Sequence, residues 1–276
     1  MIKAVLTAAI LAAIPFAAHA DDDAKAPADG SWSGSGEAGL AVSSGNTKSQ
    51  NVNLKLQFSK EDETWKDNIY LNVQRAKSES NVATVQNGQI VNVSKYELTS
   101  NRYEAGVSAG YKLDERSYIV GAVRYEHDEF SSFDYQATVS LGYGYTAIKN
   151  AQTELSFEAG PGYKRSATRP YTVVDTTVPV LSLPATIVVP GTDGELIGRG
   201  LIAFKHKFTD TTAFENTFLV ETGSNNTFLQ NDAAVSVSMT DKLALKVGYQ
   251  VRHNSDVNPG TDQTDQLLTT NLVYKF

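Results

Sequence analysis

Residues 51–58 of this 276-residue chain read NVNLKLQF, a stretch in which polar and apolar side chains alternate without a break. Successive side chains of a β-strand point to opposite faces of the sheet, so the stretch predicts a strand with one apolar and one polar face. The apolar face carries Val52, Leu54, Leu56 and Phe58, and the polar face carries Asn51, Asn53, Lys55 and Gln57. A strand of this kind suits a wall between lipid and a polar lumen.

The same alternation recurs to the end of the chain, in segments that polar turns separate. It predicts strands near residues 34–44, 50–59, 65–75, 98–112, 117–128, 134–147, 153–166, 195–208, 212–223, 227–239, 243–254 and 264–276. The expected fold class is therefore all-β, a transmembrane antiparallel β-barrel of about 12 strands over residues 33–276. An even number of strands returns both termini to the periplasmic side.

The first residues predict export from the cytoplasm. A basic residue precedes an apolar stretch that ends in Ala18-His19-Ala20, which has the small-x-small pattern of a cleavage site. We therefore predict a signal peptide over residues 1–20, followed by a disordered, acidic periplasmic tail over residues 21–32. The expected location is the cell outer membrane of a Gram-negative bacterium.

Charge and composition exclude several classes of protein. The chain carries 24 Lys and Arg against 31 Asp and Glu, a formal net charge of −7. Nucleic-acid binding needs a basic face, so this acidic balance argues against a nucleic-acid partner. Cysteine is absent, which excludes disulfides and thiolate chemistry. No apolar run long enough for a spanning helix follows the signal peptide.

The connections between the predicted strands are of two kinds. Short polar turns, typical of the periplasmic side, lie at residues 60–63, 113–116, 149–150, 209–210 and 240–241. Among the longer outer loops, residues 77–97 contain Asn87-Gly88 between two β-branched runs, which is a strong hairpin signal. Residues 167–193 hold four of the eight prolines, interleaved with valines and isoleucines. This apolar loop could lie on the rim or fold inward as a plug.

Charges of both signs fall on the faces that are predicted to point into the lumen. The basic set comprises Lys55, Arg102, Arg124, Lys164, Arg199, Lys205, Lys207, Lys246 and Arg252, and the acidic set comprises Glu37, Glu104, Glu126, Glu154, Glu158, Glu215, Glu221, Asp232 and Asp265. Balanced charges can pair and fill a narrow barrel, whereas a selective pore more often carries an excess of one sign. We therefore expect a barrel that is at most weakly permeable to small solutes. A specific small-molecule channel, or porin, is the first alternative.

An outer-membrane lipid hydrolase is the second alternative. His253-Asn254-Ser255 resembles the His-x-Ser pair of outer-membrane acyl hydrolases, in which the histidine activates the serine and a third polar residue orients the imidazole. The candidates for that third residue are Asp256, Asn258 and Asp262. In those hydrolases, however, the orienting residue stands at a position that Leu267 occupies here. We expect no enzyme, with no catalytic, cofactor-binding or metal-binding residues, and we expect His253 to lie at the rim.

The carboxy-terminus predicts how the barrel is assembled. The chain ends in Phe276, and Leu268, Leu272 and Tyr274 share its face. An aromatic end of the last strand is the assembly signal of outer-membrane barrels, so we expect the barrel-assembly machinery to bind Phe276. Outer-membrane lipids and lipopolysaccharide are the other expected partners, and the barrel is expected to be a monomer.

Several short motifs resemble those of the YdiY-like, salt- or acid-induced outer-membrane proteins, a family that is a domain of unknown function. They lie at residues 44–47 (SGNT), 160–163 (GPGY), 243–255 and 264–276. The resemblance covers nearly the whole mature chain and implies a stress-linked role, osmotic or acid, in the envelope, without catalytic residues. The family usually has an aromatic residue where this chain has His253, which argues further against the hydrolase.

Overall fold

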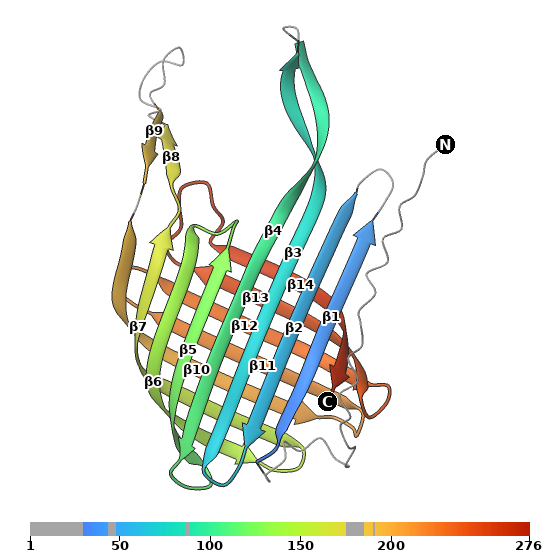
Figure 1. Ribbon diagram of the computed structural model, residues 1–276, viewed down its shortest axis with the longest axis vertical. Helices are drawn as coiled ribbons and strands as arrows, with labels where there is room; N and C mark the ends of the chain where they lie inside the picture. Colours follow the sequence, from blue (N-terminus) through green and yellow to red (C-terminus); the bar gives the residue numbers. More distant parts are fainter. Residues whose placement is uncertain (1–29, 44–47, 87–88, 175–184, 190) are drawn as a thin grey trace.

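The computed structural model describes residues 30–43, 48–86, 89–174, 185–189 and 191–276. Twelve antiparallel strands close into one barrel, in the ring order β1-β14-β13-β12-β11-β10-β7-β6-β5-β4-β3-β2 (Figure 1). The barrel strands are β1 (Trp32–Ser43), β2 (Ser49–Glu61), β3 (Trp65–Gln86), β4 (Gln89–Lys112), β5 (Ser117–Asp128), β6 (Phe133–Lys149), β7 (Thr153–Thr168), β10 (Thr192–Lys207), β11 (Thr212–Thr222), β12 (Thr227–Ser238), β13 (Leu243–Asn254) and β14 (Thr264–Lys275). No helix among the described residues is long and apolar enough to cross a membrane.

The twelve predicted strands are confirmed, and each lies where the alternation placed it. The largest departure is in β3 and β4, which continue past the barrel wall as a long hairpin whose last pair is Gln86↔Gln89. This extension is the hairpin expected within residues 77–97, and it rises beyond the neighbouring strands in Figure 1. The predicted Asn87-Gly88 turn lies outside the described residues, as do the predicted signal peptide and all but the end of the tail.

The outward side chains of the strands are apolar, as the alternation predicted. Leu56 on β2 pairs with Leu71 on β3, and the two are 43% and 40% exposed. Near the periplasmic turns, Trp65 and Tyr111 stack edge to face with ring centroids 5.4 Å apart, which is typical of an aromatic girdle. An apolar outer surface of this extent requires lipid around it. The protein is therefore a transmembrane barrel of the outer-membrane type.

The first and last strands close the barrel through the carboxy-terminal residue. The backbone N–H of Gly34 donates to the carbonyl of Phe276 over 2.7 Å, and the N–H of Phe276 donates back over 2.9 Å. Gly34 has no side chain to obstruct this contact, since a Cβ there would come within 2.2 Å of the Phe276 ring. The Phe276 ring also contacts Phe58 on β2, with centroids 5.8 Å apart. Closure therefore depends on a glycine in the first strand and an aromatic residue at the end of the last strand.

The five short connections at the periplasmic end share one construction, which explains why the strands end there. In each, a side-chain oxygen of one turn residue accepts hydrogen bonds from the backbone N–H groups two and three residues later. These residues are Asp62, Asp114, Asn150, Thr209 and Thr240. The two N–H donors, of Thr64 and Trp65, lower the pKa of Asp62 below its ordinary value. Each turn lies where short polar turns were predicted.

The proline-rich loop forms a second, smaller hairpin. Its strands β8 (Tyr171–Val174) and β9 (Ala185–Val188) pair with each other and not with the barrel. Figure 1 shows this hairpin above β7 and β10, pointing away from the barrel at the end opposite the short turns. Residues 175–184 and 190 lie outside the described residues. In its described part, therefore, the loop does not fold into the lumen as a plug, which was one of the two expectations for it.

Candidate functional site

The lumen carries the charged side chains of the strands, as predicted. On the inward faces of β4, β5 and β11, Glu104, Arg124 and Glu221 are no more than 6% exposed. Three members of the predicted set differ from the others. Lys205 and Lys207, near the end of β10, and Asp265, near the start of β14, are exposed. Both strands are still paired with their neighbours there, so alternation alone could not distinguish the middle of the lumen from its ends.

Six buried charges form one connected layer across the lumen, which we call the charged layer. It comprises Glu104, Arg124, Glu126, Lys164, Glu221 and Arg252. Arg124 is its centre, with Nε 3.1 Å from Glu104, Nη1 3.4 Å from Glu221, and Nη2 paired with Glu126. Lys164 Nζ lies 3.7 Å from Glu221. Buried charges persist only when they are paired, so these contacts require one another.

The charged layer joins walls that lie far apart around the ring. Arg252 on β13 pairs with Glu126 on β5, and these two strands are six places apart in the ring of twelve. Arg102 on β4 donates to Gln250 on β13 over 2.6 Å, and Gln250 donates to Asp232 over 2.5 Å. Side chains from opposite walls therefore meet in the middle of the lumen.

An aromatic ring lies within the same layer. Phe228 on β12 is completely buried, and three cations lie over its ring. The centroid is 4.6 Å from the Arg124 guanidinium, 5.1 Å from that of Arg252 and 5.7 Å from Lys164 Nζ. Cation–π attraction is stronger where water is excluded, so the ring stabilises cations that would otherwise repel one another.

The lumen also contains aromatic residues, which the predicted set of charged side chains does not include. Tyr70 donates to Glu104 over 2.8 Å, and Tyr118 donates to Glu158 over 3.1 Å. The sequence does contain a signal for these inward tyrosines, namely the glycines that face them on neighbouring strands. A Cβ at Gly106 would lie 2.3 Å from the Tyr70 ring, and one at Gly144 would lie 2.2 Å from the Tyr118 ring.

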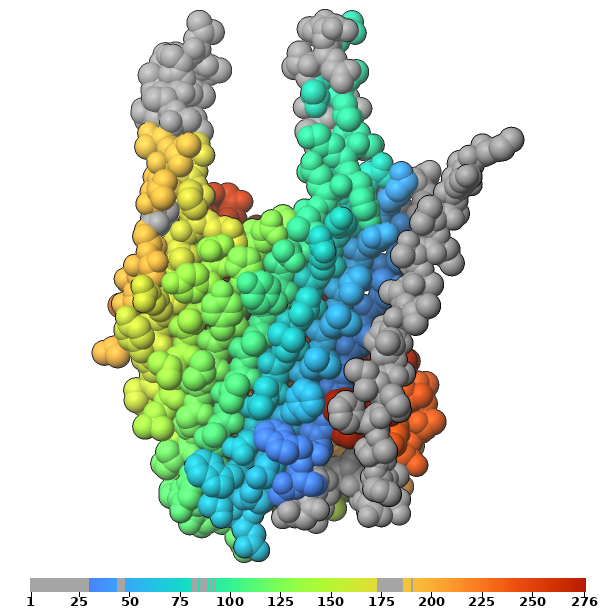
Figure 2. Space-filling model, in the orientation of Figure 1, coloured from blue at the N-terminus to red at the C-terminus, as the bar shows by residue number. Residues whose placement is uncertain are grey.

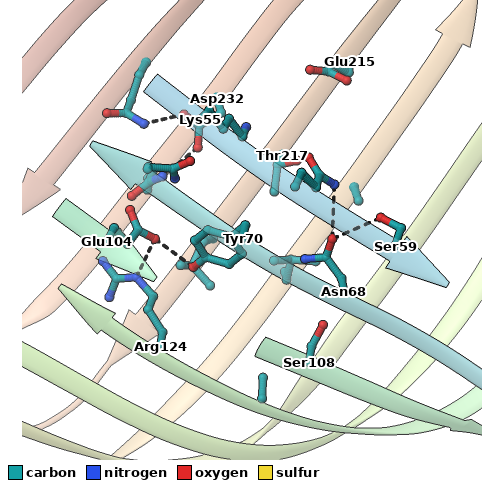
Figure 3. A pocket seen from close by; sticks show the side chains of 18 of the residues that line it. Lys55, Ser59, Asn68, Tyr70, Glu104, Ser108, Arg124, Glu215, Thr217 and Asp232 are labelled. Atoms are coloured by element: carbon teal, nitrogen blue, oxygen red, sulfur yellow. Dashed lines mark hydrogen bonds and ion pairs between the residues drawn. The ribbon is translucent and has the colours of Figure 1, made fainter. Parts of the chain in front are cut away.

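Below the charged layer the lumen contains a chamber of about 460 Å³. It extends from Lys66 and Glu154, near the periplasmic turns, to Arg124. Lys66 and Glu154 pair over 3.2 Å and are about a third exposed, so this end of the chamber is hydrated. Figure 3 looks into the chamber where it meets the charged layer, and shows Tyr70 and Arg124 both donating to Glu104.

Beyond that boundary, the outer half of the lumen has a different lining. Glu126, Lys164, Phe228 and Arg252 are all buried, and none of them lines the chamber. The chamber therefore faces the periplasm and ends at the charged layer.

The residues of the hydrolase hypothesis are not brought together. His253 Nδ1 lies 2.9 Å from Thr264 Oγ1, whereas Ser255 Oγ accepts from the Thr227 N–H and donates to Asn226 Oδ1. No hydrogen bond joins His253 to Ser255 among the described residues. Nor does one join His253 to a candidate orienting residue, Asp256, Asn258 or Asp262. In the same residues there is no group of three or more His, Asp or Glu side chains that could hold a metal ion.

Comparisons with known proteins give a family model, a relative in sequence and similar solved structures. Residues 36–276 match the family described as "Protein of unknown function, DUF481". The chain is 24% identical over 287 aligned positions to the uncharacterized protein YdiY of Escherichia coli (strain K12), covering 100% of this chain and 99% of that one. Among solved structures it is similar to the NanC porin, with 12% identity and a TM-score of 0.47 over 88% of this chain and 98% of that one. It is also similar to an outer membrane channel of Pseudomonas putida F1, with 10% identity and a TM-score of 0.45 over 93% and 99%.

Proposed function

The chain belongs to the DUF481 family of proteins of unknown function, and within that family we propose that it is a non-enzymatic outer-membrane barrel, at most weakly permeable to small solutes, with a stress-linked role in the envelope. The observation that supports this function best is the charged layer. A hydrated ion or sugar that passes the layer must separate buried ion pairs such as Arg124–Glu221. Breaking a buried pair costs about 3–5 kcal/mol, so the closed lumen is strongly favoured.

A closed lumen suits a role under osmotic or acid stress. A protein that supports the outer membrane under either stress must not add a leak for ions or solutes. A barrel with an apolar outer surface and a charged layer across its lumen meets this requirement. We therefore propose that the barrel supports the integrity of the envelope and does not transport a nutrient. The test is the survival of a strain that lacks the protein, in acid and at high osmolarity, with the wild-type chain restored as the control.

The proposal includes a monomer that the assembly machinery recognises by its last residue. One chain closes the whole ring, so the lumen is complete without a second copy. The contact between Phe276 and Gly34 joins the last strand to the first, and until it forms the aromatic end remains available to a partner.

A specific channel is the rival function, because the periplasmic chamber is a polar cavity of a size that small solutes fit. Swelling of liposomes that contain the purified barrel separates the two functions, with sugars of increasing size outside the vesicles. The proposed function predicts swelling no faster than that of empty liposomes for every sugar. Rapid swelling with one class of sugar would establish the channel and overturn the proposal.

A further inference from the structure

The outward face of β4, β5 and β6 carries a row of stacked rings near the outer end of the barrel, the end with the long loops. Tyr103 lies 4.9 Å from the His127 ring and 6.2 Å from Tyr125, and Tyr125 lies 6.1 Å from Tyr135, measured between centroids. All three pairs are stacked, with interplanar angles between 17° and 29°. We call these four rings the aromatic band. Tyrosines at this height lie where the acyl chains meet the headgroups.

Two arginines flank the aromatic band. Arg75 on β3 follows Val73, which pairs with Tyr103, so Arg75 lies diagonally across from that ring on the same face. Arg165 on β7 pairs with Ala137, so it lies diagonally across from Tyr135. Both arginines are exposed and face outward. This face of the barrel, β3 to β7, is turned to the viewer in Figure 1 and in the space-filling view of Figure 2.

Unlike the arginines of the lumen, these two have no ion-pair partner in the part of the chain that the structure describes. Arg124, Arg199 and Arg252 are all paired with carboxylates. Neither Arg75 nor Arg165 forms an ion pair or a side-chain hydrogen bond with another described residue. An outward arginine costs little near the membrane interfaces, where its guanidinium can reach the anionic groups of the lipids. No carboxylate among the described residues pairs with either arginine, so the membrane is the remaining source of anions.

Two acidic groups lie beside the aromatic band, Glu129 and Asp134. Glu129 accepts from the side chain of Asn101, the register partner of Arg75, over 2.7 Å. Asp134 pairs with Arg169 over 2.8 Å and lies 3.7 Å from His127 Nδ1. It is therefore not free to pair with either flanking arginine. The band thus combines ring faces with two unneutralised guanidinium groups at one level of the membrane.

We propose that the aromatic band, with Arg75 and Arg165, is a binding site for the phosphorylated glycolipid of the outer leaflet, lipopolysaccharide. Each guanidinium binds a phosphate of the lipid, since its planar donors match phosphate oxygens. The ring faces of Tyr103 and Tyr125 contact the sugars between the phosphates. The proposal rests on the outer surface and does not depend on whether the lumen conducts.

The test is the affinity of the purified, folded barrel for bisphosphorylated lipid A in detergent micelles, measured by native mass spectrometry. The wild type should bind this lipid, and Arg75→Gln and Arg165→Gln should each weaken the affinity about tenfold, since a hydrogen bond to a charged group is lost. Arg116→Gln is the matched control. It removes an exposed arginine from a periplasmic turn and should leave the affinity unchanged.

Two further lipids show whether the site recognises the phosphates of lipid A or any anionic lipid. Dephosphorylated lipid A should bind the wild type as weakly as bisphosphorylated lipid A binds the double variant Arg75→Gln/Arg165→Gln. Gel mobility before and after heating checks that each variant is folded, and each single variant is read separately if the double variant does not fold. Unchanged affinity in a folded Arg75→Gln or Arg165→Gln variant would overturn the proposal. Equal binding of phosphatidylglycerol would also overturn it, because the surface would then recognise any anionic lipid.

Discussion

Arg252 on β13 and Glu126 on β5 form an ion pair across the full width of the lumen, between strands on opposite walls of the barrel. A pair of this kind does two things at once. It occupies the centre of the cylinder, and it holds the two walls at the distance that the two side chains can span. Charged side chains of opposite walls therefore meet across the barrel at this level. Below it, the chamber remains open toward the periplasm.

The lipid-facing register gives the first prediction. Leu56→Arg places a charge on the outer face of β2 near the middle of the membrane, and it should destabilise the barrel by about 2–4 kcal/mol. Lys55→Gln changes the neighbouring, lumen-facing side chain and is the control. Urea titration of the barrel in liposomes measures the free energy of unfolding of both variants. If Leu56→Arg proves as stable as Lys55→Gln, the register of β2 is wrong.

Closure at the carboxy-terminus gives the second prediction. Phe276→Ala removes the ring that packs on Gly34 and Phe58, so the fraction of chains inserted in the outer membrane should fall. Phe208→Ala is the control, because Phe208 is an exposed aromatic residue (60%) beside another periplasmic turn. Quantifying the heat-modifiable form in outer-membrane fractions measures the effect. Wild-type amounts of folded Phe276→Ala would show that closure does not need the ring.

The β8–β9 hairpin gives the third prediction. Because this hairpin points away from the barrel and its strands pair with each other, deleting residues 171–188 should leave both stability and conductance unchanged. The charged layer remains in place in this variant. Currents through planar bilayers, compared with those of the parent protein, provide the measurement. An increase in current on deletion alone would identify the loop as the closing element instead of the layer.

Most of the fold could be predicted from the sequence, because each strand has one face in lipid and one in the lumen. Residues 51–58 show this in one stretch, and β2 has the predicted register along its whole length. The turns could be predicted for a related reason: Asp, Asn and Thr accept backbone hydrogen bonds where a strand must reverse. The tilt and stagger of the strands leave no comparable pattern in the sequence. The sequence predicted the hairpin of β3 and β4, but not that its strands continue from the barrel wall as far as Gln86 and Gln89.

The candidate site could be predicted only as a list of charges. Alternation gives the direction of a side chain, but which charges meet depends on the stagger of strands that lie far apart in the sequence. Arg124 and Glu221 are separated by 97 positions and pair only because β5 and β11 bring them to one level. Phe228 was missed although its place on β12, an odd number of residues from the lipid-facing Val235, puts it on the inward face.

The current through single barrels in planar bilayers shows whether the charged layer closes the lumen. The wild-type barrel should give no current above that of the bare membrane. The double variant Arg124→Ser/Arg252→Ser, which removes two of the side chains that join the walls, should give discrete conductance steps once heat-modifiability shows that it is folded. Lys55→Gln, a lumen variant below the layer, should behave like the wild type. Large steady currents from the wild type, or none from a folded double variant, would contradict the account.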